Sequence, residues 1–181
     1  MSLMNLLLEK RSNILKQWCD IILRSYPEEA QSMLRKKEDQ FGNPVGSTIS
    51  EAMESIFDEF LHGTEPKNMS RFFDKIMRVR AIQDFSPSGA VAFVFGLKDV
   101  IREEVGSRLL ENGHSEEWVT LESRIDGMAL LCFDIYAQCR QKVFDIRVNE
   151  VRNRASKLLK MGGLGYDLPD VKGDPKQVQA N

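Results

Sequence analysis

This chain of 181 residues is poor in the residue types that build metal and redox sites. It has only two histidines, His62 and His114, and three cysteines, none of them in a Cys-x-x-Cys pair. So few ligands argue against a structural zinc site. Haem needs an axial ligand that faces an apolar pocket, and neither histidine lies on an apolar helix stripe. We therefore expect no bound cofactor and no metal.

Long apolar runs are also missing. The longest, residues 89–97, is far shorter than the roughly 20 residues that cross a bilayer. Charged residues at positions 9–11 interrupt the apolar N-terminus, so it lacks the pattern of a signal peptide. We expect a cytoplasmic protein without membrane insertion.

The motifs of common catalytic sites do not occur either. There is no Gly-rich phosphate loop and no Gly-x-Ser-x-Gly elbow. Carboxylates such as Glu51, Glu54, Asp58 and Glu59 recur at helical spacing, which is more typical of a solvated helix face than of an acid/base pair. The sequence therefore predicts a protein that is not an enzyme.

Two of the cysteines share one apolar helix stripe. Cys132 and Cys139 are seven residues apart, hence about 10 Å along a helix, which is too far for an intramolecular disulfide. We predict that they are free core thiols in a reducing cytosol.

What the sequence does contain is helical periodicity nearly everywhere. Apolar content of 42% and a net charge of −2 suit one soluble globular domain and give no general reason to expect nucleic acid as a partner. The domain should cover residues 4–161, followed by a flexible tail at 162–181. The predicted helices are 3–25, 27–39, 47–62 (capped by Ser47 or Thr48 and ended by Gly63), 67–82, 87–112 and 115–161.

The last of these helices carries two apolar stripes whose combined width changes along the chain. One stripe runs from Ile125 to Ile146, and the other begins at Leu130 and Phe133. Beyond Ile146 only the second continues, as a narrow seam of the kind that pairs with one partner helix. At about 1.5 Å per residue the helix should span roughly 70 Å, so part of it should leave the globule. We predict that the seam forms a homodimer contact through five residues: Phe144, Val148, Val151, Ala155 and Leu158.

A second candidate site lies in the polar and apolar stretch 78–88. One interpretation is a simple ion pair between Arg80 and Asp84, four residues apart on a helix. The other interpretation places Arg78, Arg80, Gln83 and Phe85 at the mouth of a pocket beside the apolar helix 87–112, where an anion or polar ligand would bind. The predicted ligand-binding residues are Arg78, Arg80, Gln83, Phe85 and Tyr136.

The seam lies in a basic tract. Between residues 140 and 160 there are seven basic residues against Asp145 and Glu150. Such an excess fits nucleic acid or an anionic membrane surface. It also fits cations near the negative end of a helix that keep an exposed coiled coil soluble. We favour the second interpretation, because the tract has no interleaved aromatics.

Several strings together resemble a known family. They are FGNPVG at 41–46, RVRAIQDFSPS at 78–88, FVFGLK at 93–98, FDIY at 133–136 and RVNEV at 147–151. They look like the RsbRD-type N-terminal domain of co-antagonists of the bacterial stressosome, over about residues 6–159. The resemblance implies an all-α, globin-like bundle of about six helices with a long C-terminal helix, without haem, which dimerises through terminal helices. It supplies no catalytic residues and no ligand.

Members of this family commonly precede an output domain, such as a STAS domain or a histidine kinase. Only about 20 residues follow Met161, so we expect a stand-alone protein rather than a truncated one. The leading hypothesis is a non-enzymatic signalling module that forms a homodimer and docks an unknown downstream protein. The alternative is a globin-like protein that binds a small ligand or haem, and a third possibility is an adaptor for nucleic acid or a membrane surface.

Overall fold

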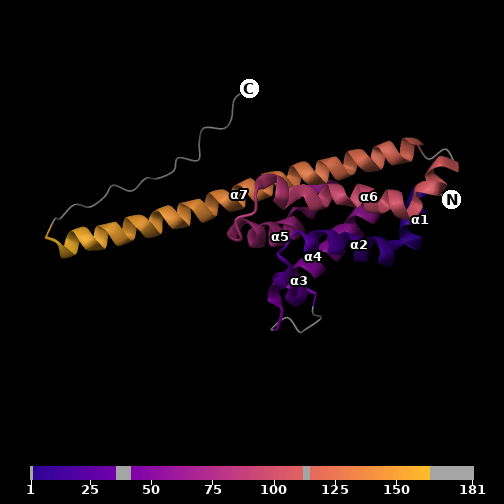
Figure 1. The fold of residues 1–181 in the computed structure, drawn as a ribbon. Coiled ribbons are helices and arrows are strands. Elements are labelled where there is room, and N and C mark those ends of the chain that lie inside the picture. The colour runs from indigo at the N-terminus through magenta and orange to yellow at the C-terminus, as the bar shows by residue number, and fades with distance from the viewer. Residues whose placement is uncertain (1, 36–41, 112–114, 164–181) are drawn as a thin grey trace, which may run out of the picture. The chain divides into compact units, whose positions relative to one another are not determined.

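The computed structural model describes residues 2–35, 42–111 and 115–163 (Figure 1). These ranges contain seven α-helices, one 3-10 helix and no strand, which confirms the all-α prediction and the long C-terminal helix. The α-helices are α1 (Leu3–Glu9), α2 (Arg11–Arg24), α3 (Glu28–Leu34), α4 (Pro44–Leu61), α5 (Ser70–Ile82), α6 (Pro87–Glu111) and α7 (Ser115–Met161), and the 3-10 helix is η1 (Pro66–Met69).

The sequence misplaced several helix boundaries, and the predicted helix 27–39, for example, ends at Leu34. The predicted helix 3–25 is divided at Lys10, whose φ of −96° and ψ of 7° end α1 and begin α2. No proline or glycine marks this break. The predicted N-cap of α4 at Ser47 or Thr48 is wrong. The cap is Asn43, followed by Pro44 in the first turn, a position where the missing N–H of proline costs nothing.

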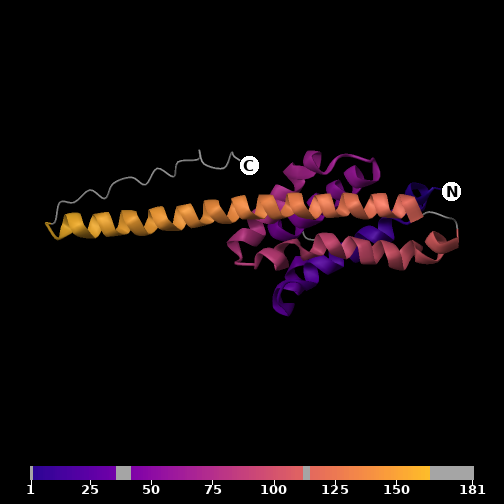
Figure 2. The same cartoon turned by 90° about the horizontal axis from the view of Figure 1, so that it is seen from above.

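The chain divides into two compact units, residues 1–141 and 142–181, with the boundary inside α7. Within the first unit, α6 and the first part of α7 run side by side and antiparallel, as the two ribbon views show (Figures 1 and 2). Two ion pairs join them: Lys98 Nζ to Asp126 Oδ1 at 2.7 Å, and Arg102 Nη2 to Glu122 Oε1 at 2.5 Å. Of the second unit, residues 142–163 are described, and they are the remainder of α7 and a turn after it.

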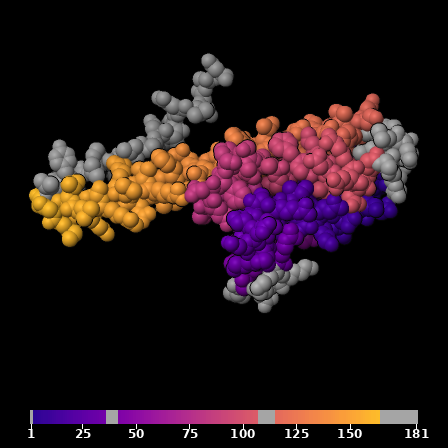
Figure 3. Space-filling model, viewed as in Figure 1, coloured from indigo at the N-terminus to yellow at the C-terminus, as the bar shows by residue number. Residues whose placement is uncertain are grey.

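The core of the first unit centres on Trp18 of α2. Its side chain is fully buried, lies against the Phe57 and Phe93 rings, and donates from Nε1 to Phe93 O at 2.7 Å. In the space-filling view, α2 and α6 meet along a continuous line of side chains (Figure 3). The apolar start of α6 is buried on the side of Ala90 and Val94, whereas Ala92 and Phe95 on its other side are exposed.

None of the helices in the described ranges combines the length and the apolar character that a bilayer span requires.

Candidate functional site

The corner between α3 and α4 is held by one buried side chain. Asn43 is 3% exposed, and its Nδ2 donates to Met33 O (3.0 Å) and Leu34 O (3.1 Å), while its Oδ1 accepts from Gly46 N (2.9 Å). A Cβ at Gly46 would lie 2.3 Å from Asn43 Nδ2 and 2.6 Å from Leu34 O. Residue 46 must therefore be glycine for Asn43 to tie the end of α3 to the start of α4.

A buried cation lies at the C-terminal end of α5. Arg80 is 0% exposed. Its Nη1 donates to Gly89 O (2.9 Å) and Ala90 O (3.0 Å) in the first turn of α6. Its Nη2 donates to Ser25 Oγ (2.6 Å) and Ile22 O (3.3 Å) at the end of α2. One guanidinium thus joins the ends of α2 and α5 to the start of α6.

Three aromatic rings surround this guanidinium. The Cζ atom of Arg80 lies 4.6 Å from the ring centroid of Phe85, 5.1 Å from that of Phe93 and 5.5 Å from that of Tyr26. Cation–π attraction offsets part of the cost of burying the charge. The remaining cost shows in the pKa of Arg80, which burial lowers from its ordinary value while Tyr26 opposes the shift.

Two atoms of this cluster have no hydrogen-bond partner. Among the buried side-chain nitrogens and oxygens of the described residues, only Tyr26 Oη and Arg80 Nε are unpaired. Tyr26 is 5% exposed, and burial raises the pKa of its hydroxyl, against the pull of the Arg80 cation. The two side chains nevertheless interact with each other, since Tyr26 opposes the lowering of the Arg80 pKa and Arg80 opposes the raising of the Tyr26 pKa.

Tyr26 also borders a cavity of about 230 Å³ at the α3–α4 corner. The cavity, which we call the corner cavity, opens between α3, the start of α4 and the residue after α5. Its lining consists of Tyr26, Ala30, Met33, Leu34, Asn43, Pro44, Val45 and Gln83.

A second cavity of about 420 Å³ lies between the segment 84–87 and α7. There Tyr136 Oη donates to Phe85 O, and Arg140 Nη1 pairs with Asp84 Oδ1. We call it the α7 cavity, and its lining consists of Asp84, Phe85, Ser86, Pro87, Phe133, Tyr136, Ala137 and Arg140.

The five predicted ligand residues therefore do not line one common pocket. Phe85 and Tyr136 line the α7 cavity, and Gln83 lines the corner cavity. Arg80 is buried, lines neither cavity and donates its hydrogen bonds to the protein itself. Arg78 is exposed and pairs with Asp74 at 2.6 Å.

Arg80 and Asp84 do not form the predicted ion pair with each other. Both terminal nitrogens of Arg80 donate to carbonyl and hydroxyl oxygens. Asp84 pairs instead with Arg140, 56 residues along the chain. Asp84 lies beyond the end of α5 and has a φ of 56°, so the two residues do not share a helix, and residues distant in sequence supply their partners.

Sequence reasoning missed Tyr26 and Asn43. The order Asn43-Pro44 is a recognisable start signal, since asparagine favours the N-cap and proline the first helical position. Tyr26 carried no such signal, because its role depends on Arg80, which follows 54 residues later.

The five seam residues lie in the second unit, on α7. Phe144, Val148, Val151 and Leu158 are exposed (Leu158 to 69%), and Ala155 is half-buried. In the first unit, three further apolar residues of α7 at the same helical spacing are also exposed: Leu130 (70%), Phe133 and Ala137.

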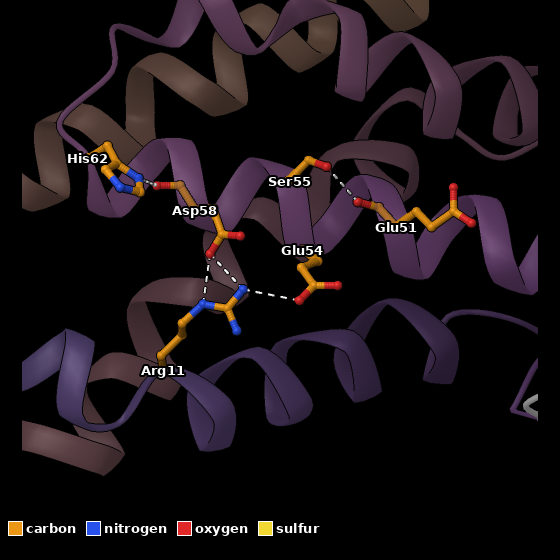
Figure 4. A network of polar contacts seen from close by, with 6 residues as sticks. All are labelled: Arg11, Glu51, Glu54, Ser55, Asp58 and His62. Atoms are coloured by element: carbon orange, nitrogen blue, oxygen red, sulfur yellow. Dashed lines mark hydrogen bonds and ion pairs between the residues drawn. The ribbon is translucent and has the colours of Figure 1, made fainter.

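The carboxylates of α4 serve as ion-pair partners for α2. Arg11 Nη2 lies 2.6 Å from Asp58 Oδ1 and 3.1 Å from Glu54 Oε1 (Figure 4).

His62, at the end of α4, is exposed and its Nδ1 lies 2.7 Å from Asp58 O. His114 lies outside the described residues. The described part of the chain contains no cluster of three or more potential metal ligands.

The cysteines are free, and Cys132 and Cys139 are buried as predicted. Burial raises the pKa of the Cys132 thiol to about 12 and that of the Cys19 thiol to about 11. Neither is therefore a reactive thiolate near neutral pH.

The family model for the RsbT co-antagonist protein rsbRD N-terminal domain matches residues 12–151. The chain belongs to this family. The match includes both cavities, the Arg80 cluster and the seam as far as Val151. An uncharacterized protein of Archaeoglobus fulgidus is 27% identical over 143 residues, which cover 77% of this chain and 83% of that protein. No solved structure matches.

Membership of the RsbRD N-terminal family indicates a regulatory domain associated with the stressosome, and the family is not known for enzymatic activity.

Proposed function

We propose that this RsbRD-type protein is a non-enzymatic regulatory module of the cytoplasm that forms a homodimer through α7 and docks a separate signalling protein. The observation that carries the proposal is the row of exposed apolar residues on a helix of a regulatory family. Scattered apolar residues on a surface are ordinary, but a continuous row at helical spacing is typical of an interface.

The spacing of the row fits a paired helix. Phe144, Val151 and Leu158 are seven residues apart, with Val148 and Ala155 between them. These are the a and d positions of a heptad pattern, which keeps one narrow face against one partner helix. The seven-residue spacing continues backwards to Ala137 and Leu130, both exposed on α7 in the first unit.

The test is Val151→Asp, with Asn153→Asp as the matched control on the same turn. Asn153 is exposed and lies off the seam. Burying a carboxylate against an apolar partner helix is strongly unfavourable. Val151→Asp should therefore yield monomers by sedimentation velocity, with unchanged helicity, while Asn153→Asp stays dimeric. A dimer that tolerates Val151→Asp would refute the seam.

A second candidate function is ligand binding, which the two cavities favour. Haem is the less supported ligand. His62, the histidine that the structure describes, is exposed, and its Nδ1 already lies 2.7 Å from Asp58 O at the end of α4. A Soret band after addition of haem to the purified protein would revive that form.

A further inference from the structure

We infer that the seam binds a second copy of α7 in parallel and that Gln141 sets this orientation, an inference that rests on the homodimer proposed above. Gln141 lies on α7, seven residues before Val148 and fourteen before Ala155. These two seam residues hold the a positions, so Gln141 takes the a position one heptad earlier. The seam thus begins with a polar side chain in a row that is otherwise apolar.

The helix face that carries Gln141 is turned away from the core of the first unit. Ala137 and Gln141, both on this face, are exposed. Ile135, Tyr136 and Cys139, on the opposite face, are buried. A helix that packs along the seam therefore also meets the side chain of Gln141.

In a parallel dimer each a residue faces the same residue of the other copy. The side-chain amide of Gln141 contains both donors and an acceptor, so two facing amides satisfy each other by a hydrogen bond. A single polar residue among apolar a positions is the best-attested device for fixing the register of paired helices, at some cost in stability.

Antiparallel pairing would leave this amide against an apolar side chain. Each a residue then meets a d residue, and the register that overlaps the seam most fully sets Gln141 against Leu158. Burying an unpaired amide in this way costs about 1 to 3 kcal/mol. A shift by one heptad in one direction sets Gln141 against Val151. The opposite shift sets Phe144 against Gly162, which has no side chain to pack.

The charges beside the seam fit a second copy of the same helix. In the parallel dimer Arg140 of each copy lies opposite Asp145 of the other, at the spacing of an interhelical ion pair, and Arg147 lies opposite Arg152. In the antiparallel dimer Asp145 lies opposite Arg152, and Arg147 opposite Arg154. Asp145 therefore meets an arginine of the other copy in either orientation. Because each orientation also brings two arginines together, the amide and not the charge decides between them.

The test is the distance between nitroxide labels on Lys160→Cys in the full chain, measured by pulsed electron paramagnetic resonance. Lys160 is exposed and lies on the face of α7 opposite the seam. A Cys19→Ser background removes the half-buried thiol, while Cys132 and Cys139 are buried.

The two orientations predict different label distances. In a parallel dimer the two labels lie at the same level, so we expect one distance of about 20 to 30 Å from the widths of two packed helices and the labels. In the antiparallel register of fullest overlap, Lys160 would lie level with Cys139 of the other copy. That offset is three heptads, roughly 30 Å along the axis, and would give a label distance of about 40 Å or more.

Three variants of the labelled chain test the role of Gln141. Gln141→Leu should add a second, longer distance, because an apolar a residue tolerates either orientation. Gln141→Asn keeps an amide and should keep the single short distance. Gln138→Leu is the matched control, since Gln138 is exposed on the preceding turn but lies beside the a and d positions. It should also keep the single short distance. Circular dichroism checks that each variant is folded.

Two results would overturn the inference and leave the homodimer in place. One is a labelled dimer that shows only the long distance, since the seam then pairs antiparallel. The other is a Gln141→Leu dimer with the same single short distance, since Gln141 then does not set the orientation. A monomeric chain in sedimentation velocity would overturn the homodimer and the inference together, so the two failures are distinguishable.

Discussion

Arg140 Nη1 lies 2.5 Å from Asp84 Oδ1 and 2.8 Å from Ala81 O, so α7 caps the C-terminal end of α5. Asp84 is also the one non-glycine residue with positive φ (56°) in the described chain. Aspartate tolerates this left-handed conformation better than most residues, and here it also holds the cation of α7.

Paired substitutions at Asp84 separate the backbone effect from the ion pair. Asp84→Gly and Asp84→Ala both remove the carboxylate, but only alanine is strained at φ 56°. We expect the free energy of unfolding of Asp84→Ala to be about 1 kcal/mol lower than that of Asp84→Gly. Urea denaturation measures the difference. Equal stability of the two variants would mean that residue 84 does not hold a positive φ in solution.

Removal of the buried Arg80 side chain should lower the free energy of unfolding far more than the Asp84 substitutions do. Arg80→Ala loses four hydrogen bonds and three ring contacts and leaves a void, so we expect a loss of about 3 kcal/mol or more. Arg80→Met keeps a long but apolar side chain, so its loss in free energy of unfolding should be smaller than that of Arg80→Ala by at least about 1 kcal/mol. The exposed neighbour serves as control, since Arg78→Ala breaks one i,i+4 pair with Asp74, worth about 0.5 kcal/mol or less. Equal losses for Arg80→Ala and Arg80→Met in urea titrations would show that the charge, not the packing, stabilises this cluster.

The helices themselves were largely predictable, because their apolar periodicity is local information. The bounds of α7 match the prediction, and Gly63 ends α4 with a φ of 77° as expected. The stripe through Cys132 and Cys139 is buried, and the stripe through Leu130 and Phe133 is exposed. Periodicity assigns residues to faces in this way, but it does not say which face meets the core.

The cluster around Arg80 was not predictable, because its partners lie far away in the sequence. Within the string 78–88, Arg78 and Arg80 look alike, yet one is exposed and the other fully buried. The difference arises because Arg80 alone donates to Ser25, which follows α2, and to two carbonyls of α6. These carbonyls belong to Gly89 and Ala90, which are 9 and 10 residues further along the chain. The role of Tyr26 follows from the same contacts, so no local pattern announced it.

Alkaline pH should destabilise the protein through its buried thiols. The pKa of Cys132 is raised to about 12 from an ordinary 9.0. The unfolded chain therefore loses this proton first as pH rises, and stability is full below pH 9 and falls between about pH 9 and pH 12. At pH 10 the loss is about 1 kcal/mol for such a thiol.

The measurement is the free energy of unfolding at pH 8 and pH 10 for the wild type and Cys132→Ala. The substitution changes stability at both pH values, so the quantity to compare is the difference between them. We expect a smaller difference in Cys132→Ala. An unchanged difference would mean that Cys132 ionises in the folded protein as readily as in the unfolded chain.

The two helical glycines Gly46 and Gly106 should respond in opposite directions to alanine. At Gly46 the new Cβ would meet Asn43 Nδ2 at 2.3 Å and the backbone oxygen of Leu34 at 2.6 Å, while at Gly106 nothing lies within 4 Å. Gly106→Ala should therefore stabilise the protein by about 0.5 to 1 kcal/mol through helix propensity. Gly46→Ala must break the Asn43 bonds or move α3, which we expect to cost about 2 kcal/mol or more. If Gly46→Ala instead raised the melting temperature as Gly106→Ala should, Asn43 would not be holding the α3–α4 corner, and the corner cavity would lose the wall that shapes it.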